Sequence, residues 1–274
     1  MSSKPKCVMI LSEGPSDRAA LTGFFTDLYA MIDENIDVFF PILCETKLNE
    51  EGNIETNYNG DITSRNGINK DNILPMILKL FIHPELKKHT EYEYPTSVSE
   101  VIHLVDIDGV YLDDCRIKAC EDPDIKLPYY DDENNIILAK DRGNLISRNQ
   151  RKRENLEKIV NTKRLRITME EGALESREKP YRVFFFSKDL DHILYGKANN
   201  ESYRKVSDAQ HFANSYYGDP LAMARFFLEH KQSSPVNKYK DSWQWLTNDH
   251  VTLEPRTNLN ILVADLLSRA KVKV

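Results

Sequence analysis

The sequence predicts an α/β fold in which a mostly parallel sheet carries helices on both faces. Two observations lead to this prediction. Short continuous apolar runs, typical of strands buried on both sides, alternate with longer segments whose apolar residues recur at helical spacing. Acidic residues follow three of these runs directly, at the strand ends where open parallel sheets bind their ligands. Such an alternating order implies right-handed crossovers and helices packed on the sheet.

The first half of the chain supplies two expected strands and two expected helices. A strand is expected at residues 6–12, which end just before Glu13-Gly14, and a helix from Pro15 to Ile32, where apolar residues keep the i, i+3, i+4, i+7 pattern. A second strand is expected at residues 36–43. The polar residues 49–69 predict an exposed loop, and a helix follows from Asp71 to His83, where Pro84 is expected to end it.

The second half supplies two more strands and a helical C-terminal region. Strands are expected at residues 101–105 and 182–186, and helices at 206–217, 220–230 and 259–270. More than seventy residues separate the two strands, which is long for a connection in a compact domain. The predicted organisation is a catalytic core formed by residues 1–110 and 180–200, a charged insertion at 111–179 and a C-terminal helical region at 201–274.

Composition limits the class of protein. The 274 residues are 41% hydrophobic and 29% charged, with a net charge of -6, and no apolar stretch reaches the roughly 20 residues of a membrane span. The N-terminus has no small-residue cleavage site after its apolar run, so a cytoplasmic protein without a membrane partner is expected. The four cysteines are scattered without zinc-binding spacing, which favours free thiols.

The predicted insertion has two halves of opposite charge. Residues 121–133 hold six acidic residues and one lysine, whereas residues 142–166 hold nine basic residues and two glutamates. A dense basic segment in an acidic protein predicts a clamp for the phosphate backbone of nucleic acid. A solvated helix face remains the alternative. The candidate nucleic-acid-binding residues are Arg142, Arg148, Arg151, Lys152, Arg153, Lys158, Lys163, Arg164 and Arg166.

The acidic residues after the strands predict a divalent metal site. Carboxylate oxygens are the ligands of Mg²⁺, and crowded carboxylates without a cation would repel one another. Asp106 and Asp108 are expected to point the same way from their strand and share a metal, and Asp17 is expected to lie beneath Glu13. Lys188 is expected either to hold a phosphate or to be an exposed lysine. The candidate metal ligands are Glu13, Asp17, Asp106, Asp108, Asp189 and Asp191.

These motifs resemble those of a known family. The segment from Val8 to Asp17, with Glu13-Gly14 at its centre, and the later Asp106-Ile107-Asp108 resemble the signature of the Toprim domain of primases, topoisomerases and small nucleases. Asp189-Leu190-Asp191 is similar to the Asp-Leu-Glu segment of the OLD-family nucleases, with Asp in place of the Glu. The resemblance implies a Toprim-like fold and cleavage of RNA, possibly tRNA, or DNA with two Mg²⁺ or Mn²⁺ ions.

The resemblance also implies roles and partners. Glu13 would be the general acid/base or a metal ligand, Asp106 and Asp108 metal ligands, and Asp191 a ligand of the second metal; the expected catalytic residues are Glu13, Asp106 and Lys188. Stand-alone chains of this kind resemble the toxic Toprim effectors of bacterial anti-phage defence systems of the PARIS type. The expected partners are therefore nucleic acid, a separate ATPase that sequesters or activates the chain, and a second copy in a homodimer. The chain itself has no Walker A pattern.

Two other interpretations remain open. The segment from Leu104 to Val110 is also similar to the first motif of HAD phosphatases, in which Asp106 would be the nucleophile and Asp108 the acid/base. Ser187 would then be the phosphate-binding hydroxyl, and Gly218-Asp219 the late acidic motif. The other interpretation is a non-catalytic Toprim-fold module that binds a partner through the insertion or the C-terminal helix.

Overall fold

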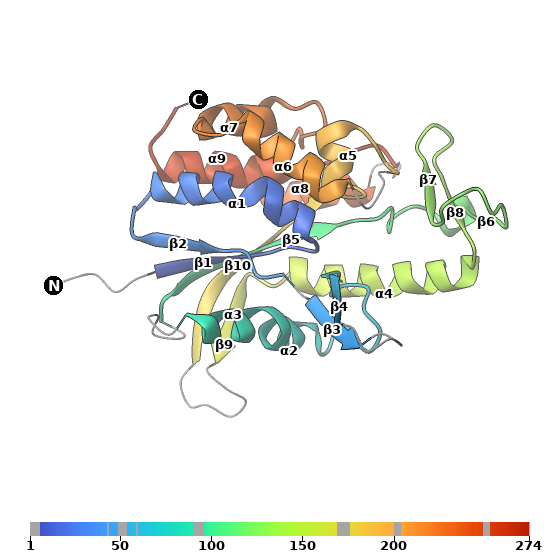
Figure 1. The fold of residues 1–274 in the computed structure, drawn as a ribbon, viewed down its shortest axis with the longest axis horizontal. Helices are drawn as coiled ribbons and strands as arrows, with labels where there is room; N and C mark the ends of the chain where they lie inside the picture. Colours follow the sequence, from blue (N-terminus) through green and yellow to red (C-terminus); the bar gives the residue numbers. More distant parts are fainter. Residues whose placement is uncertain are drawn as a thin grey trace.

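A five-stranded sheet forms the centre of the protein. The structure is a computed structural model that describes residues 6–42, 44–48, 54–58, 60–89, 92, 96–168, 176–199, 204–248 and 253–273. The strand order is β2-β1-β5-β10-β9 (Figure 1). β2, β1, β5 and β10 are parallel, and β9 joins the edge of β10 antiparallel. The strands are β1 (Lys6–Leu11), β2 (Ile36–Phe39), β5 (Val98–Asp106), β9 (Arg164–Thr168) and β10 (Ser176–Phe186).

Helices cover both faces of this sheet, which confirms the predicted α/β class (Figure 1). On one face, α1 (Pro15–Ala30), α6 (Lys205–Ser215), α7 (Pro220–Glu229) and α9 (Leu259–Arg269) enclose one apolar cluster. On the other, α2 (Ile73–Ile77), the π-helix η1 (Leu78–Ile82), α3 (His83–Lys88), α4 (Arg142–Val160) and α8 (Tyr239–Asn248) enclose a second. The short helix α5 (Leu190–Tyr195) follows β10. Because β1 and β5 are almost wholly buried, their near-continuous apolar sequences suit a sheet covered on both faces.

Two smaller sheets lie beside the central one. β3 (Cys44–Leu48) and β4 (Ile54–Tyr58) form an antiparallel hairpin. β6 (Ile117–Ala119), β8 (Ile136–Ala139) and β7 (Tyr129–Asp131) form a three-stranded sheet, which η2 (Asp114–Arg116) precedes. This second sheet has its own apolar cluster around Ile117 and Ile137. α4 extends from it to the central sheet (Figure 1).

Part of the predicted insertion belongs to the core. Leu156 and Ile159 of α4 and Leu165 and Ile167 of β9 are buried in the same cluster as residues of β1 and β5. The expected boundaries at 111 and 179 stay a prediction, but these two elements pack as core elements. None of the helices in the described residues is both long enough and apolar enough to cross a bilayer.

Two local predictions are wrong. Residues 49–69 are not simply an exposed loop, because β4 lies within them and Ile62, Thr63 and Ile68 are buried; residues 43, 49–53 and 59 lie outside the described part. Helical structure also continues through Pro84 to Lys88. The turn before Pro84 is a π-helix, whose wider i to i−5 hydrogen bonds accommodate a ring that an α-helical turn would clash with.

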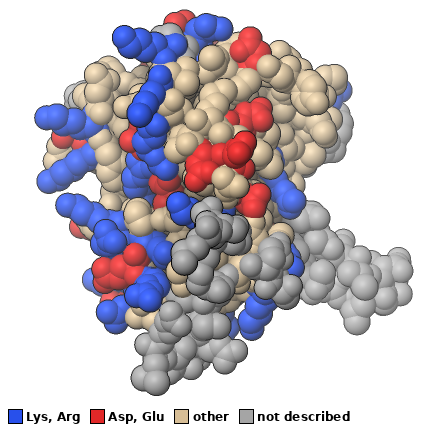
Figure 2. Space-filling model, turned by 90° about the vertical axis from the view of Figure 1, so that its left-hand side faces the viewer, with Lys and Arg blue, Asp and Glu red and all other residues tan. Residues whose placement is uncertain are grey.

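An ion-pair cluster fixes the sheet near the amino ends of its strands. Glu100 of β5 is buried and accepts from Arg182 of β10 at 3.1 Å and from Arg269 of α9 at 2.7 Å. Arg182 also pairs with Asp265 at 3.0 Å. On the face that Figure 2 shows, most basic side chains lie toward the left of the view and a group of acidic side chains lies near the middle. The charges of the Glu100 cluster neutralise one another, so they leave little excess charge to attract a ligand.

Candidate metal centre

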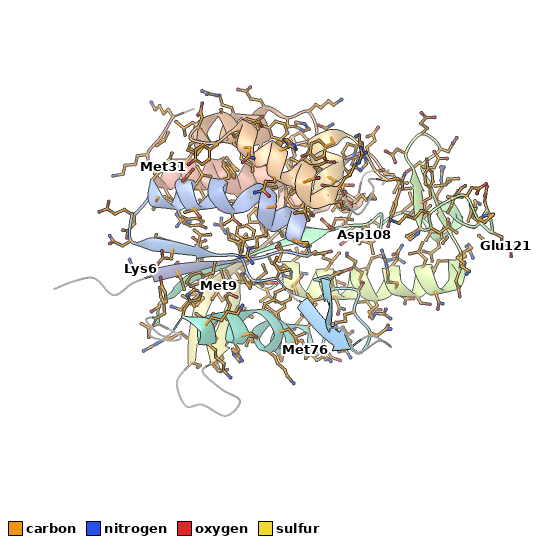
Figure 3. All side chains as sticks on the ribbon, viewed as in Figure 1. Lys6, Met9, Met31, Met76, Asp108 and Glu121 are labelled. Atoms are coloured by element: carbon orange, nitrogen blue, oxygen red, sulfur yellow. The ribbon has the colours of Figure 1, made fainter. Side chains whose placement is uncertain are left out.

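The acidic residues that follow β1, β5 and β10 meet at the carboxyl ends of these parallel strands. Figure 3 shows Asp108 there, between the helical layers, while Lys6 lies at the other end of the sheet. Three segments close this end: the β1–α1 turn with Glu13, the β5 end with Asp106 and Asp108, and the β10–α5 turn with Asp189. This is the place where an open α/β sheet binds ligands.

One group of carboxylates, which we call the Glu13 cluster, consists of Glu13, Asp61 and Asp108. One ligand oxygen from each lies within 4.8 Å of the others, and all three residues are half-buried. The ammonium group of Lys152 lies among them, with Nζ 2.9 Å from Asp61 Oδ2, 2.9 Å from Asp108 Oδ2 and 3.6 Å from Glu13 Oε1. Three carboxyl groups therefore surround one ammonium group, and Arg148 lies beside Asp108 as a second cation.

Backbone packing brings Glu13 and Asp61 close together. Gly60 packs directly on the main chain of Glu13: a Cβ atom on Gly60 would lie 2.6 Å from the Glu13 Cα and closer still to its carbonyl group. Asp61 Oδ1 accepts from the N–H groups of Thr63 and Ser64 at 3.0 and 3.1 Å, an Asx turn that fixes its carboxylate. The N–H of Asp106 donates to Glu13 Oε1 at 3.1 Å. Only glycine fits at position 60.

The turns after β5 and β10 hold each other in sparsely populated conformations. Asp108 has a φ of 51° and Lys188 a φ of 61°. The N–H of Asp108 donates to the carbonyl oxygen of Lys188 at 3.1 Å. Asp106 is not one of the three residues of the Glu13 cluster, and the expectation that it shares a metal with Asp108 stays a prediction. Non-glycine residues in the left-handed region cost free energy and concentrate at functional sites.

A second group, the Asp189 cluster, contains Asp17, Asp189 and Asp191 with two lysines. Lys188 Nζ is 2.7 Å from Asp189 Oδ2, and Lys205 Nζ is 2.8 Å from Asp189 Oδ2 and 3.3 Å from Asp191 Oδ2. Lys188 is buried, with its Nζ 5.0 Å from the ring centroid of Tyr130, so the alternative of an exposed lysine is wrong. Asp191 is only 2% exposed, yet its Oδ1 accepts no hydrogen bond from a described residue.

Local structural roles accompany these positions. Asp17 accepts from the N–H of Gly14 at 3.0 Å, which closes the first turn of α1. Asp189 is the N-cap of α5 and accepts from the N–H of His192 at 3.0 Å. Helix-capping roles therefore exist alongside the charge clusters, and one carboxylate can fulfil both because it has two oxygens.

Burial sets the protonation of the carboxylates. It raises the pKa of Glu13 and of Asp106 well above the usual range; the carboxylates of Asp61 and Asp108 add to the shift at Glu13, while those of Glu13 and Asp17 add to it at Asp106. Burial likewise raises the pKa of Asp17 to about 7, against the hydrogen bond from Gly14. Without a cation, these groups resist ionisation.

The pKa values of Asp61 and Asp189 are lowered instead, because lysine side chains contact these two carboxylates. Burial acts to raise the pKa of Asp61, but Lys152 and the hydroxyls of Ser64 and Thr63 outweigh it and lower the pKa. Burial is likewise outweighed at Asp189, where Lys188 and Lys205 lower the pKa. Ionised carboxylates are therefore present in both clusters.

The residues present fit divalent cations. Carboxylate oxygens are the donors that Mg²⁺ and Mn²⁺ prefer, and they come here from several chain segments at one sheet edge. The second observation is the buried Oδ1 of Asp191, which lacks a hydrogen-bond donor among the described residues. A buried acceptor without a donor is costly unless a ligand satisfies it.

The basic residues of the predicted nucleic-acid clamp divide into two groups. Lys152 is fully buried in the Glu13 cluster and cannot be part of a surface clamp, so its assignment is corrected. Five of the other basic residues bind protein groups: Arg142 donates to Ile117 O, Arg148 pairs with Asp108, Arg151 donates to Ser64 O, Arg153 pairs with Asp114 and Arg164 pairs with Glu178. The side chains of Lys158, Lys163, Arg164 and Arg166 are exposed.

Three charged groups at the site were not predicted to belong to it. Asp61 was assigned to a loop, although an aspartate followed by Thr63 and Ser64 is a recognisable turn motif. Lys152 was assigned to the surface, although it lies seven residues after Leu145 and four before Leu156, on the buried stripe of α4. Lys205 begins α6 with no distinctive local pattern.

The residues of the HAD interpretation are engaged elsewhere. The hydroxyl of Ser187 donates to the carbonyl oxygen of Glu254 at 3.0 Å, and Asp219 is an exposed N-cap that accepts from Ala222 N–H at 2.9 Å. Comparisons of the chain with protein-family models, curated proteins and solved structures found no match.

Proposed function

We propose that this chain is a divalent-metal-dependent nuclease, which hydrolyses phosphodiester bonds of nucleic acid at the carboxyl end of its sheet. The observation that carries the proposal is the Glu13 cluster, in which carboxylates from three separate segments bring ligand oxygens within 4.8 Å of one another. The Toprim resemblance of the Glu13 and Asp106-Ile107-Asp108 motifs supports the same chemistry.

Glu13, Asp61 and Asp108 would hold one ion. The candidate ligands of the second ion, which the Toprim resemblance implies, are Asp106, Asp189 and Asp191. When bound, divalent ions supply Lewis-acid polarisation of the phosphate and a water of lowered pKa. Asp17 lies behind them, where it closes the first turn of α1.

The cationic side chains of the site have distinct tasks. Lys152 offsets part of the repulsion within the Glu13 cluster and fixes the positions of Asp61 and Asp108. Lys188 and Lys205 do the same for Asp189. Arg148 Nη2 lies 3.6 Å from Asp108 Oδ2. These fixed charges would orient a phosphate without reorganisation.

Nucleic acid is the substrate class that the surface charge favours. The exposed Lys158, Lys163, Arg164 and Arg166 lie at the end of α4 and on β9, and such side chains give salt-sensitive, sequence-independent affinity for phosphates. A phosphatase of the HAD type is less well supported, because the hydroxyl of Ser187 donates to Glu254 O and Asp219 caps a helix.

The experiment compares cleavage by the wild type and by Glu13→Gln. Total RNA and plasmid DNA are incubated with each protein in Mg²⁺ or Mn²⁺, and Glu154→Gln, a change at an exposed residue of α4, is the matched control. We expect Glu13→Gln to lower the cleavage rate roughly 100-fold or more, since even outer-shell partners of a metal contribute 10 to 100-fold. Glu154→Gln should cleave like the wild type.

The regulation of the activity is part of the same proposal. The resemblance to anti-phage effectors implies an ATPase partner, so the assay is repeated with the chain co-expressed with the products of neighbouring genes. Cleavage that appears only then, and is lost in Glu13→Gln, supports the effector role. If no cleavage is seen in any condition and Mn²⁺ does not shift the melting temperature, only the interaction-module interpretation is left.

A further inference from the structure

A pocket of about 530 Å³ lies beside the Glu13 cluster and is not explained by metal binding. It is formed by the N-terminal half of α4, the end of β8, the segment before β7 and the turn that follows Asp61; we call it the α4 pocket. Its volume is within the roughly 300 to 1,000 Å³ of small-molecule sites.

Two arginines connect the pocket to the candidate metal centre. Arg148 and Arg151 both line the pocket. Arg148 Nη2 is 3.6 Å from Asp108 Oδ2, and Arg151 donates through Nε and Nη2 to the carbonyl oxygen of Ser64, at 3.0 and 2.9 Å. Ser64 in turn donates to Asp61. A ligand in the pocket would therefore lie one side chain away from two carboxylates of the Glu13 cluster.

The pocket has an unsatisfied donor. Arg148 Nη2 is buried and donates no hydrogen bond to a described residue, and the Arg148 side chain is 27% exposed. Lys140 adds a third cation to the lining, whereas the single acid there, Asp141, is engaged as the N-cap of α4 through Asn144. Arg148 Nη2 faces Asp108 Oδ2 at 3.6 Å, which is beyond hydrogen-bond distance, so its N–H groups can still donate to another anionic oxygen, and phosphate suits the geometry of a guanidinium.

The remaining wall is apolar. Leu127, Pro128 and Leu145 line it, and Asn66 offers an amide at the rim. A site that only bound phosphate would not need an apolar wall, whereas a flat base can pack on apolar side chains and an amide can hydrogen-bond its edge. The combination of an arginine pair and an apolar wall matches one nucleotide unit.

We propose that the α4 pocket binds one unpaired nucleotide of a nucleic-acid strand, with its phosphate at Arg148 and Arg151 and its base against Leu127, Pro128 and Leu145. The inference rests on the proposed nuclease function and specifies its substrate. Because a base in a duplex is stacked and paired, a concave pocket of this kind selects single-stranded segments or loops.

The test blocks the pocket without touching the carboxylates. Ser147 is exposed on α4 and lines the pocket, and Ser147→Trp would fill it; Gln150, three residues along the same helix and also exposed, is not a lining residue, so Gln150→Trp is the matched control. Binding of a labelled six-nucleotide oligoadenylate is measured by fluorescence anisotropy in EDTA, so that no cleavage occurs. If Ser147→Trp does not fold, Ser147→Leu is the smaller replacement.

We expect Ser147→Trp to weaken binding at least about tenfold, the equivalent of 1.4 kcal/mol, and Gln150→Trp to change it by less than about twofold. The wild type should bind the single strand about tenfold more tightly than the same sequence embedded in a longer, stable duplex. Equal effects of the two tryptophans, or equal affinity for duplex, would overturn the proposal.

Further arms identify the ligand. Ribo- and deoxyribo-oligonucleotides are compared, and AMP and inorganic phosphate are used as competitors. Competition by AMP that Ser147→Trp abolishes supports a nucleotide unit, whichever sugar is preferred. Competition by inorganic phosphate as effective as that by AMP contradicts it. Since binding is measured without metal, intact pocket-dependent binding with no cleavage would reject the nuclease proposal alone, whereas cleavage unaffected by Ser147→Trp would reject the pocket alone.

Discussion

Lys152 is a cation that the chain itself contributes to its carboxylates. Its side chain is fully buried, and its pKa is raised well above the usual lysine range, because the attraction of Asp108, Asp61 and Glu13 outweighs burial, which acts to lower it. The ammonium is therefore charged across the physiological range. A buried ion pair adds little net stability compared with apolar packing, but removal of one partner leaves uncompensated charge.

Lys152→Met should destabilise the metal-free protein by about 3 to 5 kcal/mol, because three carboxylates lose the cation among them. Mn²⁺ should then raise the melting temperature of the variant more than that of the wild type. Lys158→Met, at an exposed position of the same helix, is the control and should lie within about 0.5 kcal/mol. Identical urea unfolding of Lys152→Met and wild type in EDTA would contradict the role assigned to Lys152.

The close contact of Gly60 with Glu13 predicts that a larger residue at position 60 weakens both the fold and the metal site. Gly60→Ala places a methyl group where Glu13 main-chain atoms already lie, so the turn must move. We expect a loss of about 2 kcal/mol or more in the free energy of unfolding and a weaker Mn²⁺ shift. Gly23→Ala is the matched control: its added methyl would meet nothing within 4 Å in α1, and it should stabilise by up to about 1 kcal/mol. Equal effects would exclude a special role for Gly60.

Sequence alone identified carboxylates that follow apolar strands, and missed those held by tertiary contacts. Glu13 and Asp108 were predictable because a strand end determines their place in the sheet. Asp61 was not, since it reaches the site through the packing of Gly60 on Glu13, a contact between residues 47 positions apart. That Asp106 and Asp108 share a metal stays a prediction, whereas the φ of 51° at Asp108 is a feature that the local sequence did not reveal.

Helix α4 joins three parts of the molecule along its length. Its N-terminal half lines the α4 pocket, Lys152 enters the Glu13 cluster, and Leu156 and Ile159 enter the core on the sheet. Its buried stripe is interrupted by polar side chains, and Asn155 donates to the carbonyl oxygens of Thr63 and Ile68. The polar part of this stripe thus holds the turn that carries Asp61.

Asn155→Leu tests whether Asn155 positions the turn that carries Asp61, in addition to stabilising the fold. The leucine keeps the volume of the stripe but removes the two donations to the turn, which leaves the buried carbonyl oxygen of Thr63 without this donor. We expect a loss of about 1 to 3 kcal/mol and a weaker Mn²⁺ thermal shift. Leu156→Ala, which creates a cavity in the same helix, should cost about 2 to 5 kcal/mol but leave the affinity for Mn²⁺ unchanged. Mn²⁺ titrations monitored by calorimetry test this; equal weakening in both variants would contradict it.

The helices and strands that could be predicted from the sequence are those with many buried residues. The strands β1, β5 and β10 and the helix α1 were predicted because burial imposes continuous or periodic apolar sequence on them. The sheet of β6, β7 and β8 was not, since short strands with few buried residues carry little pattern. The hairpin of the five-residue strands β3 and β4 was not predicted either. β9 lies at the sheet edge, where basic residues alternate with Leu165 and Ile167.

The two ends of the sheet differ in their charged groups. Acidic and basic side chains are matched at the amino ends of the strands, whereas acidic side chains are in excess at the carboxyl ends. At the amino ends of the strands, Glu100, Arg182, Asp265 and Arg269 neutralise one another. At the carboxyl ends, carboxylates outnumber the lysines, and burial raises the pKa of several of them. The stability of the metal-free protein therefore depends on pH through groups with opposite effects.

His103, in the core of the sheet, affects the pH dependence of stability in the opposite direction to the buried carboxyl groups. Burial lowers its pKa to about 3, whereas an unfolded chain protonates it near the ordinary value of about 6.5. Between these values the unfolded state binds a proton that the folded state does not, so the free energy of unfolding falls as the pH falls below about 6.5, by at most about 1.4 kcal/mol per unit. Asp17, whose pKa is raised to about 7, has the opposite sign: the folded state gains stability as the pH falls from about 7 to about 4.

The histidine contribution can be isolated by substitution. Between pH 7 and pH 5, in EDTA, His103→Phe should lose about 2 kcal/mol less than the wild type in urea unfolding, because the variant lacks the group that protonates only when unfolded. Nδ1 of His103 lies 2.8 Å from the hydroxyl oxygen of Tyr181, so Tyr181→Phe is the control that breaks this contact and keeps the histidine. Tyr181→Phe should retain the wild-type dependence on pH. If His103→Phe kept it as well, the stability of the protein would not depend on a neutral histidine in its core.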